Sequence, residues 1–265
     1  MNITKYYRAG IIEIHSLRAF IVNFYTSLLY YPAELIILYF IWKLIFSAIG
    51  IETIGGFTFS MLISYFILQR ILARFLSSGK LVRELDTLIN RGNLVTYLTR
   101  PVNFVAFKFS QTVTMSVIQT ALGCISFVVV VGLLNLTISY QGVNWIMFIP
   151  LIFMALLIIF MLDFLLGILA FWLGRVEHIR IVYSLLLRIV SGALVPISFF
   201  PQEIQSILGM LPFQYMFYVP ISIVVGAAEL SLSTFMVPVF WIIILAVLLK
   251  IGWSRGLNRF EVQGG

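Results

Sequence analysis

The chain has 265 residues, of which 62% are hydrophobic and only 10% are charged, and its mean hydropathy is +1.08. Because a water-soluble domain of ordinary composition carries about 25% charged residues, these values exclude a soluble globular protein. The formal net charge of +7 is typical of a membrane protein with basic cytoplasmic loops, and it gives no reason to predict nucleic-acid binding.

Uncharged apolar stretches of about 20 residues recur along the chain, and each can cross about 30 Å of hydrocarbon as an α-helix. Lys and Arg collect in every second gap between these stretches. Because basic loops stay on the cytoplasmic side, this alternation places both ends of the chain inside. The sequence predicts a single all-α polytopic membrane domain over residues 1–265. Its six spans cover residues 21–46, 57–77, 105–134, 146–173, 181–200 and 235–253.

Residues 1–20 carry apolar side chains at helical spacing, with charged residues between them. This pattern predicts an amphipathic helix that lies on the inner surface of the membrane. The segment has no continuous apolar core, so we expect no cleavable signal peptide. The first span then serves as the insertion signal.

The first span contains a proline and a carboxylate, Pro32 and Glu34. Pro32 removes a backbone donor and can kink the helix. An ionisable residue inside a span is a functional candidate by default. We therefore regard these two residues as a candidate part of a transport path, with a role in helix packing as an equally open alternative.

The longest polar stretch, residues 78–104, follows the second span, and its basic residues mark it as cytoplasmic. These are Lys80, Arg83, Arg91 and Arg100. Leu81, Leu85 and Leu88 fall on one face of a helix, so we expect an amphipathic helix over residues 80–91. Composition alone also fits a helix that lies on lipid headgroups.

Two charged residues, Asp163 and Arg188, fall at membrane depth in the fourth and fifth spans. Asp163 lies about 14 residues before the middle of a tight inner turn, and Arg188 lies about 11 residues after it. In two antiparallel helices their depths then differ by about 4–5 Å, at 1.5 Å per residue. We predict an ion pair between them, acting either as a structural clamp or as a proton or substrate relay.

The apolar segment 196–230 is repeatedly interrupted, by Pro196, Pro201, Pro212, Pro220 and Gly226. Counting residues 211–227 as a seventh span would place the basic C-terminal end outside, against the positive-inside rule. We instead expect a broken re-entrant hairpin over residues 201–230, in which two short helices dip into the membrane from the outside.

The sequence lacks the motifs of ATP-binding and metal-dependent enzymes. It contains no G-x-x-x-x-G-K-[ST] phosphate loop, so this chain does not itself bind ATP in that way. The single cysteine, Cys124, cannot form an intrachain disulfide, and one Cys with two His gives no zinc-ligand spacing. We expect no catalytic residue, metal or cofactor in this chain.

Two stretches of sequence add a family resemblance to this layout. The first joins Gly92-Asn93-Leu94 to Leu98-Thr99-Arg100-Pro101-Val102-Asn103. The second comprises Pro196-Ile197-Ser198-Phe199-Phe200-Pro201, Leu211-Pro212-Phe213 and Tyr218-Val219-Pro220. With its surface helix, inner helix and broken outer hairpin in this order, the whole chain resembles the permease subunits of type-2 ATP-binding-cassette (ABC-2) exporters. The two stretches are similar to those of the small permeases grouped with viologen and antibiotic exporters.

The resemblance implies specific partners. One is a separate ATPase subunit, which would bind ATP and Mg²⁺. Another is a second permease, identical or related, beside this one in the lipid bilayer of the plasma membrane, which is the inner membrane in bacteria. Residues 1–20 would be the elbow helix of the family, and residues 79–100 would be the coupling region that docks on the ATPase.

The resemblance also assigns roles to residues at the two ends of the spans. We expect an exposed leucine ridge to bury apolar area on the ATPase, with charged side chains setting the register. The predicted coupling residues are Leu81, Arg83, Glu84, Leu85, Leu88 and Arg91. Spans 1, 2 and 5 would line the path, and the outer hairpin would form an extracellular gate. The predicted gate residues are Phe199, Phe200, Pro201, Pro212, Phe213 and Pro220.

The sequence therefore predicts a permease that exports a hydrophobic or amphipathic molecule with ATP hydrolysed by another chain. Two other classes fit the same composition. One is a secondary transporter in which Glu34 or Asp163 carries protons, and the other is a membrane scaffold or integral enzyme. The sequence does not identify the transported molecule, because one scaffold can serve many substrates.

Overall fold

The structure is a computed structural model, and it describes residues 18–76, 79–133, 139 and 145–264. The predicted surface helix at residues 1–20 lies almost wholly outside the described residues. In chain order the elements are α2 (Arg18–Ile49), β1 (Thr53–Ile54), β2 (Phe57–Thr58), α3 (Phe59–Phe75), α4 (Lys80–Asn90), α5 (Val95–Leu98), α6 (Phe104–Leu133), α7 (Trp145–Ile168), α8 (Ala170–Leu173), α9 (Glu177–Val190), η1 (Ile197–Phe199), α10 (Gln202–Met210), η2 (Phe213–Tyr215), α11 (Tyr218–Val225) and α12 (Ser233–Gly264).

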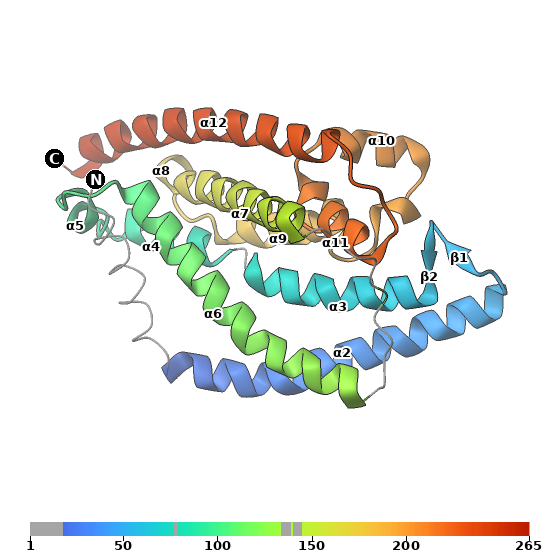
Figure 1. Cartoon of the computed structure of the whole chain (residues 1–265). Coiled ribbons are helices and arrows are strands. Elements are labelled where there is room, and N and C mark those ends of the chain that lie inside the picture. Colours follow the sequence, from blue (N-terminus) through green and yellow to red (C-terminus); the bar gives the residue numbers. More distant parts are fainter. Residues whose placement is uncertain (1–17, 77–78, 134–138, 140–144, 265) are drawn as a thin grey trace.

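The long helices form a bundle around α3. Figure 1 shows α3 between α2 on one side and α7 and α11 on the other, with α6 crossing obliquely and α12 packed along α7. The helices α4 and α5 and the last turns of α12 lie at one end of the bundle, and the antiparallel hairpin β1–β2 and α10 lie at the other. The charge pattern predicts that the first of these ends is cytoplasmic.

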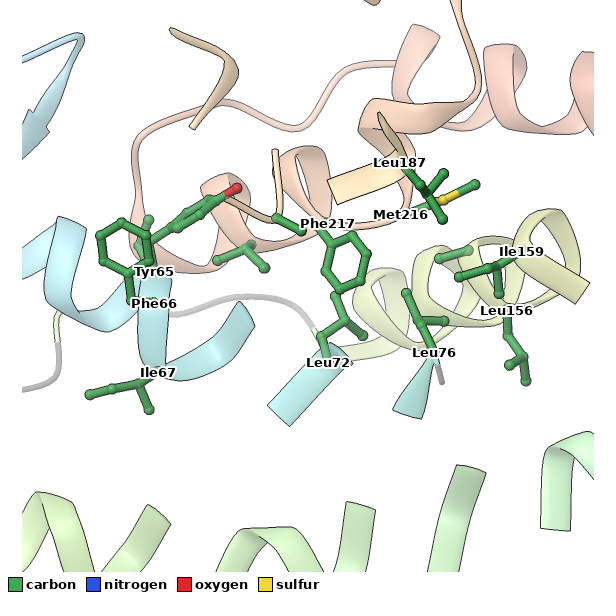
Figure 2. Packing of buried hydrophobic residues seen from close by; sticks show 14 of the residues in the cluster. Tyr65, Phe66, Ile67, Leu72, Leu76, Leu156, Ile159, Leu187, Met216 and Phe217 are labelled. Atoms are coloured by element: carbon green, nitrogen blue, oxygen red, sulfur yellow. The ribbon is translucent and has the colours of Figure 1, made fainter. Parts of the chain in front are cut away.

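The interior consists of two apolar clusters. The central cluster joins α3 to α7, α9 and α11, and Figure 2 shows side chains of α3, α7 and α9 together with Met216 and Phe217 in it. The second cluster joins α4 to α7 and α12 at the predicted cytoplasmic end. In lipid, close van der Waals packing of this kind holds helices together, because the surrounding acyl chains are equally apolar.

Three helical stretches of the described residues are long and apolar enough to cross a membrane. They are Phe59–Asn90, which includes the undescribed residues 77–78, Phe148–Leu173 and Ser233–Phe260. The helices α2 and α6, of 32 and 30 residues, lie at the places predicted for spans 1 and 3. The structure is thus that of a mostly helical membrane protein, and the six-span arrangement stays a prediction.

The boundaries predicted for the fifth span are wrong. Residues 181–200 were expected to form one helix, whereas α9 has only 14 residues and ends at Val190. The chain turns at Gly192, whose φ of +80° favours glycine, and the Tyr65 hydroxyl donates a 2.7 Å hydrogen bond to the Gly192 carbonyl. A Cβ at this position would lie 2.7 Å from the Cβ of Tyr218, so the close approach of α11 also requires glycine.

The segment after α9 contains two short helices, α10 and α11, of nine and eight residues. Residues 211–227 therefore do not form one continuous helix. All of α11 from Pro220 to Val225 is buried against the bundle, whereas α10 exposes Ile207 and Met210. Whether this segment enters the membrane from the outside stays a prediction.

Candidate functional site

The predicted coupling region folds as two helices, α4 and α5, which we call the inner arm (residues 80–98). The apolar face of α4 turns into the bundle, and its buried side chains are Leu81, Val82, Leu85 and Ile89. Leu85 is fully buried against α7. There a Cβ added to Gly167 would lie 2.6 Å from a Leu85 methyl carbon, Cδ1. The absent side chain of Gly167 thus makes the notch that receives Leu85.

The prediction of an exposed leucine ridge is therefore wrong for Leu81 and Leu85. Both are buried, and Leu88 is half-buried against the same cluster. An amphipathic helix buries its apolar face against whichever apolar surface lies nearest, and for α4 that surface is the chain's own α7. The leucines support the position of the inner arm and are not available for a partner.

The first polar anchor of the inner arm is at the beginning of α4. The Gly79 N–H donates a 2.8 Å hydrogen bond to the Oδ2 carboxylate oxygen of Asp163 in α7, and Asp163 is only 3% exposed. The first N–H groups of a helix lack internal partners and carry the positive end of the helix dipole. Asp163 therefore caps α4 from a neighbouring helix.

Arg188 does not meet Asp163 as predicted. In the part of the chain that the structure describes, Asp163 and Arg188 form no ion pair, and Arg188 is exposed on α9 while its neighbour Leu187 is buried. Similar depth along two antiparallel helices does not fix the rotation of each helix about its axis. A step of one residue turns the side chain by about 100°, which is enough to move Arg188 away from the interior.

The second anchor joins the middle of α4 to α6 through a buried cation. Lys108 of α6 is 1% exposed, and its Nζ lies 2.5 Å from Oε1 of Glu84 and donates a 3.0 Å hydrogen bond to Oε1 of Gln111. The same nitrogen lies 4.9 Å from the centroid of the Tyr97 ring in α5, at cation–π distance. The side chains of Phe104 and Phe107 complete the aromatic surroundings.

The third anchor joins the end of α4 to the tight turn before α9. The Val176 N–H donates a 3.0 Å hydrogen bond to Oδ1 of Asp86, and the Asn90 amide donates one of 3.3 Å to the Gly174 carbonyl. Directly after this turn, at the start of α9, Arg180 and Glu177 form an ion pair at 2.5 Å. The hydrogen bond from Arg180 lowers the pKa of Glu177 from its ordinary value.

A small pocket of about 40 Å³, lined by apolar and charged side chains, lies where α4, α6 and α7 meet. Its charged lining comprises Lys80, Glu84, Lys108 and Asp163. A pocket of this size has room for water, which needs only about 10–15 Å³ and polar partners. Residues of the first two anchors, Asp163, Glu84 and Lys108, therefore line one small space at the base of the bundle.

The opposite side of the inner arm is exposed. We call this side the exposed face, and it consists of Arg83, Thr87, Arg91, Val95 and Leu98. Val95 and Leu98 are apolar side chains that are 51% and 39% exposed. The exposed face thus combines cationic side chains with a small apolar patch, on a helix whose other face is fixed to the bundle.

The candidate path residues of the first span, Pro32 and Glu34, lie in α2 and not near the inner arm. Glu34 of α2 forms an ion pair with Arg70 of α3, and its second carboxylate oxygen is buried without a hydrogen-bond partner among the described residues. Pro32 belongs to α2, but its side chain lies outside the described part of the chain. The structure therefore gives Glu34 a partner that the sequence did not predict.

The predicted gate residues lie around the other end of the bundle. Phe199 contacts the rings of Trp42 and Phe57, at centroid distances of 5.5 and 6.0 Å. Phe213 packs against the central cluster, whereas Phe200 is half-buried at the end of η1. Three prolines mark helix boundaries or interiors in this segment: Pro201 caps α10, Pro212 precedes η2, and Pro220 is buried in α11.

A comparison with protein families decides the class. The family model described as ABC-2 family transporter protein matches residues 33–264. The chain belongs to the ABC-2 transporter family. No curated protein matches the sequence. As an ABC-2 permease the chain is a membrane component of a transporter and is not itself catalytic, and permeases of this family work with an ABC ATPase subunit.

Sequence reasoning missed two residues that this ABC-2 permease uses in its interior. Lys108 was predicted to lie within the third span at 105–134, where a cation at the inner end needs a partner as much as Asp163 does. Gly167 carries no side chain, so only the structure shows that it receives Leu85. The one signal in the sequence was that Lys108 is a cation within a predicted span for which no partner had been assigned.

Proposed function

We propose that this ABC-2 permease exports a hydrophobic or amphipathic molecule, driven by ATP that a separate ATPase subunit hydrolyses. The observation that supports this proposal is the inner arm. It is fixed to α6, α7 and the turn before α9 by three polar anchors, and it leaves one face exposed. A helix held in this way suits the transfer of motion from a soluble partner into a membrane bundle.

Motion of the ATPase reaches the bundle through the close packing of α4 against α7. When the ATPase pair closes on ATP, a subunit docked on the exposed face displaces α4. Because Leu85 sits in the notch at Gly167, α4 cannot slide along α7 without a clash. The displacement therefore passes to α7, and through Lys108 and Asp86 to α6 and α9.

The docking contact follows from the side chains that remain exposed. Arg83 and Arg91 favour an acidic groove on the ATPase, since complementary charges steer association and fix register. Val95 and Leu98 supply the apolar contact that the buried leucines cannot provide. Glu84, which is 39% exposed, lies at the edge of this surface.

The permease works as one of a pair, identical or related, in the plasma membrane (the inner membrane of a bacterium), with six spans and both termini in the cytoplasm. The helix α9 supports this arrangement, because most of its apolar side chains are exposed. Arg188 lies among them at membrane depth, where a cation needs water or a polar neighbour. A second permease across a central path supplies that environment, and the segment containing Phe199 and Phe213 gates its outer end.

Site-directed photo-crosslinking tests the docking contact. A photoreactive amino acid in place of Val95 is expected to attach covalently to the ATPase in membranes, because this side chain points out of the inner arm. The same residue at Leu232, which is 75% exposed but lies at the far end of the bundle, serves as the control. Crosslinks to the ATPase from Leu232 and none from Val95 would contradict the proposal.

A further inference from the structure

The buried cation Lys108 connects three elements at a single atom. Its Nζ contacts the Glu84 carboxylate from α4, the Gln111 amide from α6 and the Tyr97 ring from α5. Lys108 itself is 1% exposed. Both helices of the inner arm thus meet the first turns of α6 at one ammonium group.

Because burying a charge is costly, the contact of Lys108 with Glu84 and Tyr97 resists separation. A buried ammonium loses its hydration and is stabilised only while its partners stay within bonding distance. Moving the inner arm away from α6 would leave the buried Lys108 without its carboxylate, with the neutral Gln111 amide as its remaining hydrogen-bond acceptor. That loss is more costly than breaking an exposed ion pair. The arrangement therefore favours joint motion of the inner arm and α6.

The Glu84 side of the pair responds to docking. Glu84 is 39% exposed while Lys108 is buried, so a subunit on the exposed face covers the carboxylate and not the ammonium. Removing water from around one partner strengthens the attraction between the two charges. Binding of the ATPase then tightens the contact between α4 and α6, although Lys108 does not touch the ATPase.

We propose that Lys108 is a positioning residue of transport, which locks the inner arm to α6 so that both move as one body when ATP binds to the partner subunit. This inference rests on the proposed function, because it needs an ATPase on the exposed face. It assigns to Lys108 a role in transmission that is separate from docking.

Distance measurements between two spin labels test the lock. The single cysteine, Cys124, lies on α6 and accepts one label, and the exposed Asn93 between α4 and α5 is replaced by cysteine for the other. The complex of permease and ATPase in lipid nanodiscs is measured without nucleotide and with a non-hydrolysable ATP analogue. With Lys108 in place, we expect the same narrow distance distribution in both states.

Four variants separate transmission from folding. In Lys108→Gln, the distribution should stay narrow without nucleotide and shift or broaden when the ATP analogue binds. Lys108→Arg keeps the charge and should restore the native result. Lys250→Gln makes the same change at an exposed lysine of α12 and should leave the distances unchanged. If Lys108→Gln fails to fold, Glu84→Gln removes the same charge pair from its exposed side.

The possible outcomes are distinct. Nucleotide-dependent broadening in Lys108→Gln or Glu84→Gln, rescued by Lys108→Arg, supports the lock. An unchanged distribution in both neutral variants, or a nucleotide-dependent shift in the native chain, overturns it while the co-purified ATPase still supports the proposed function. If no ATPase co-purifies with the native chain, the proposed function fails and this inference fails with it.

Discussion

At the scale of single residues, the tightest contact between the inner arm and the bundle is Leu85 against Gly167. A methyl group on Gly167 would lie 2.6 Å from Cδ1 and 2.9 Å from Cβ of Leu85. We expect Gly167→Ala to destabilise the protein by about 1–3 kcal/mol, the usual cost of overpacking a core. Thermal unfolding in detergent micelles measures the effect.

Gly132 of α6 gives the matched control, since a Cβ there would meet nothing within 4 Å. Gly132→Ala should be neutral or stabilise by up to about 1 kcal/mol, because alanine is the better helix former. Leu85→Ala removes the contacts at Cδ1 and Cγ but keeps the one at Cβ, so this second substitution should cost less stability in the Gly167→Ala background than in the native chain. Equal unfolding temperatures for the Gly167 and Gly132 variants would show that the notch does not exist.

Asp163 and Arg188 are charged residues of similar predicted depth with different surroundings. Asp163→Ala leaves the buried Gly79 N–H without this acceptor and should cost about 1–3 kcal/mol, whereas Asp163→Asn keeps an acceptor and should cost less. Arg188→Ala should leave the unfolding temperature nearly unchanged. In the double variant Asp163→Ala/Arg188→Ala the two effects should add. A large coupling energy would instead indicate the ion pair that the sequence predicted.

At the scale of elements, the first helical turn of α9 carries a pH-dependent contact. Because Arg180 lowers the pKa of Glu177 in the folded protein, the pair stabilises the turn above the unfolded pKa of Glu177. That stabilisation is lost as the pH falls through the folded pKa. Hydrogen exchange should show stronger protection of residues 177–182 in the native chain than in Glu177→Gln at neutral pH.

The difference between these two chains should vanish once the pH is below the folded pKa of Glu177, since the side chain at position 177 is then uncharged in both. A difference that persists unchanged at acidic pH would show that the ion pair does not hold the turn. Lys250→Gln, a neutralisation on α12, should leave the protection of this turn as it is in the native chain.

The elements also show what periodicity can and cannot predict. The spacing of Leu81 and Leu85 predicted an amphipathic α4, and the structure confirms it. The pattern gives one apolar face, but it cannot say whether α7, a lipid or another subunit covers that face. For α9, the hydropathy of residues 181–200 predicted one long helix, whereas the helix ends at Val190 and the chain turns at Gly192, where Tyr65 and Tyr218 pack closely.

At the scale of the whole molecule, composition and the alternation of basic loops were enough to predict a helical membrane protein, and the matched family confirms an ABC-2 permease. The partners of Asp163, Glu34 and Lys108 depend on how helices distant in sequence are rotated against one another, and no local pattern encodes that. Glu34 is the clearest example. The sequence places Arg70 in the second span, but it does not indicate that the Arg70 and Glu34 side chains face each other.

The central claim is that a separate ATPase drives this permease through the exposed face of the inner arm. Purification of the native chain in mild detergent, followed by identification of the bound proteins, tests it most directly. We expect an ABC ATPase to co-purify with the native chain and to be lost from the Arg91→Glu variant. It should be retained by Lys43→Glu, which reverses an exposed charge near the C-terminal end of α2. An intact native chain that retains no ATPase, or an Arg91→Glu variant that retains it fully, would contradict the account.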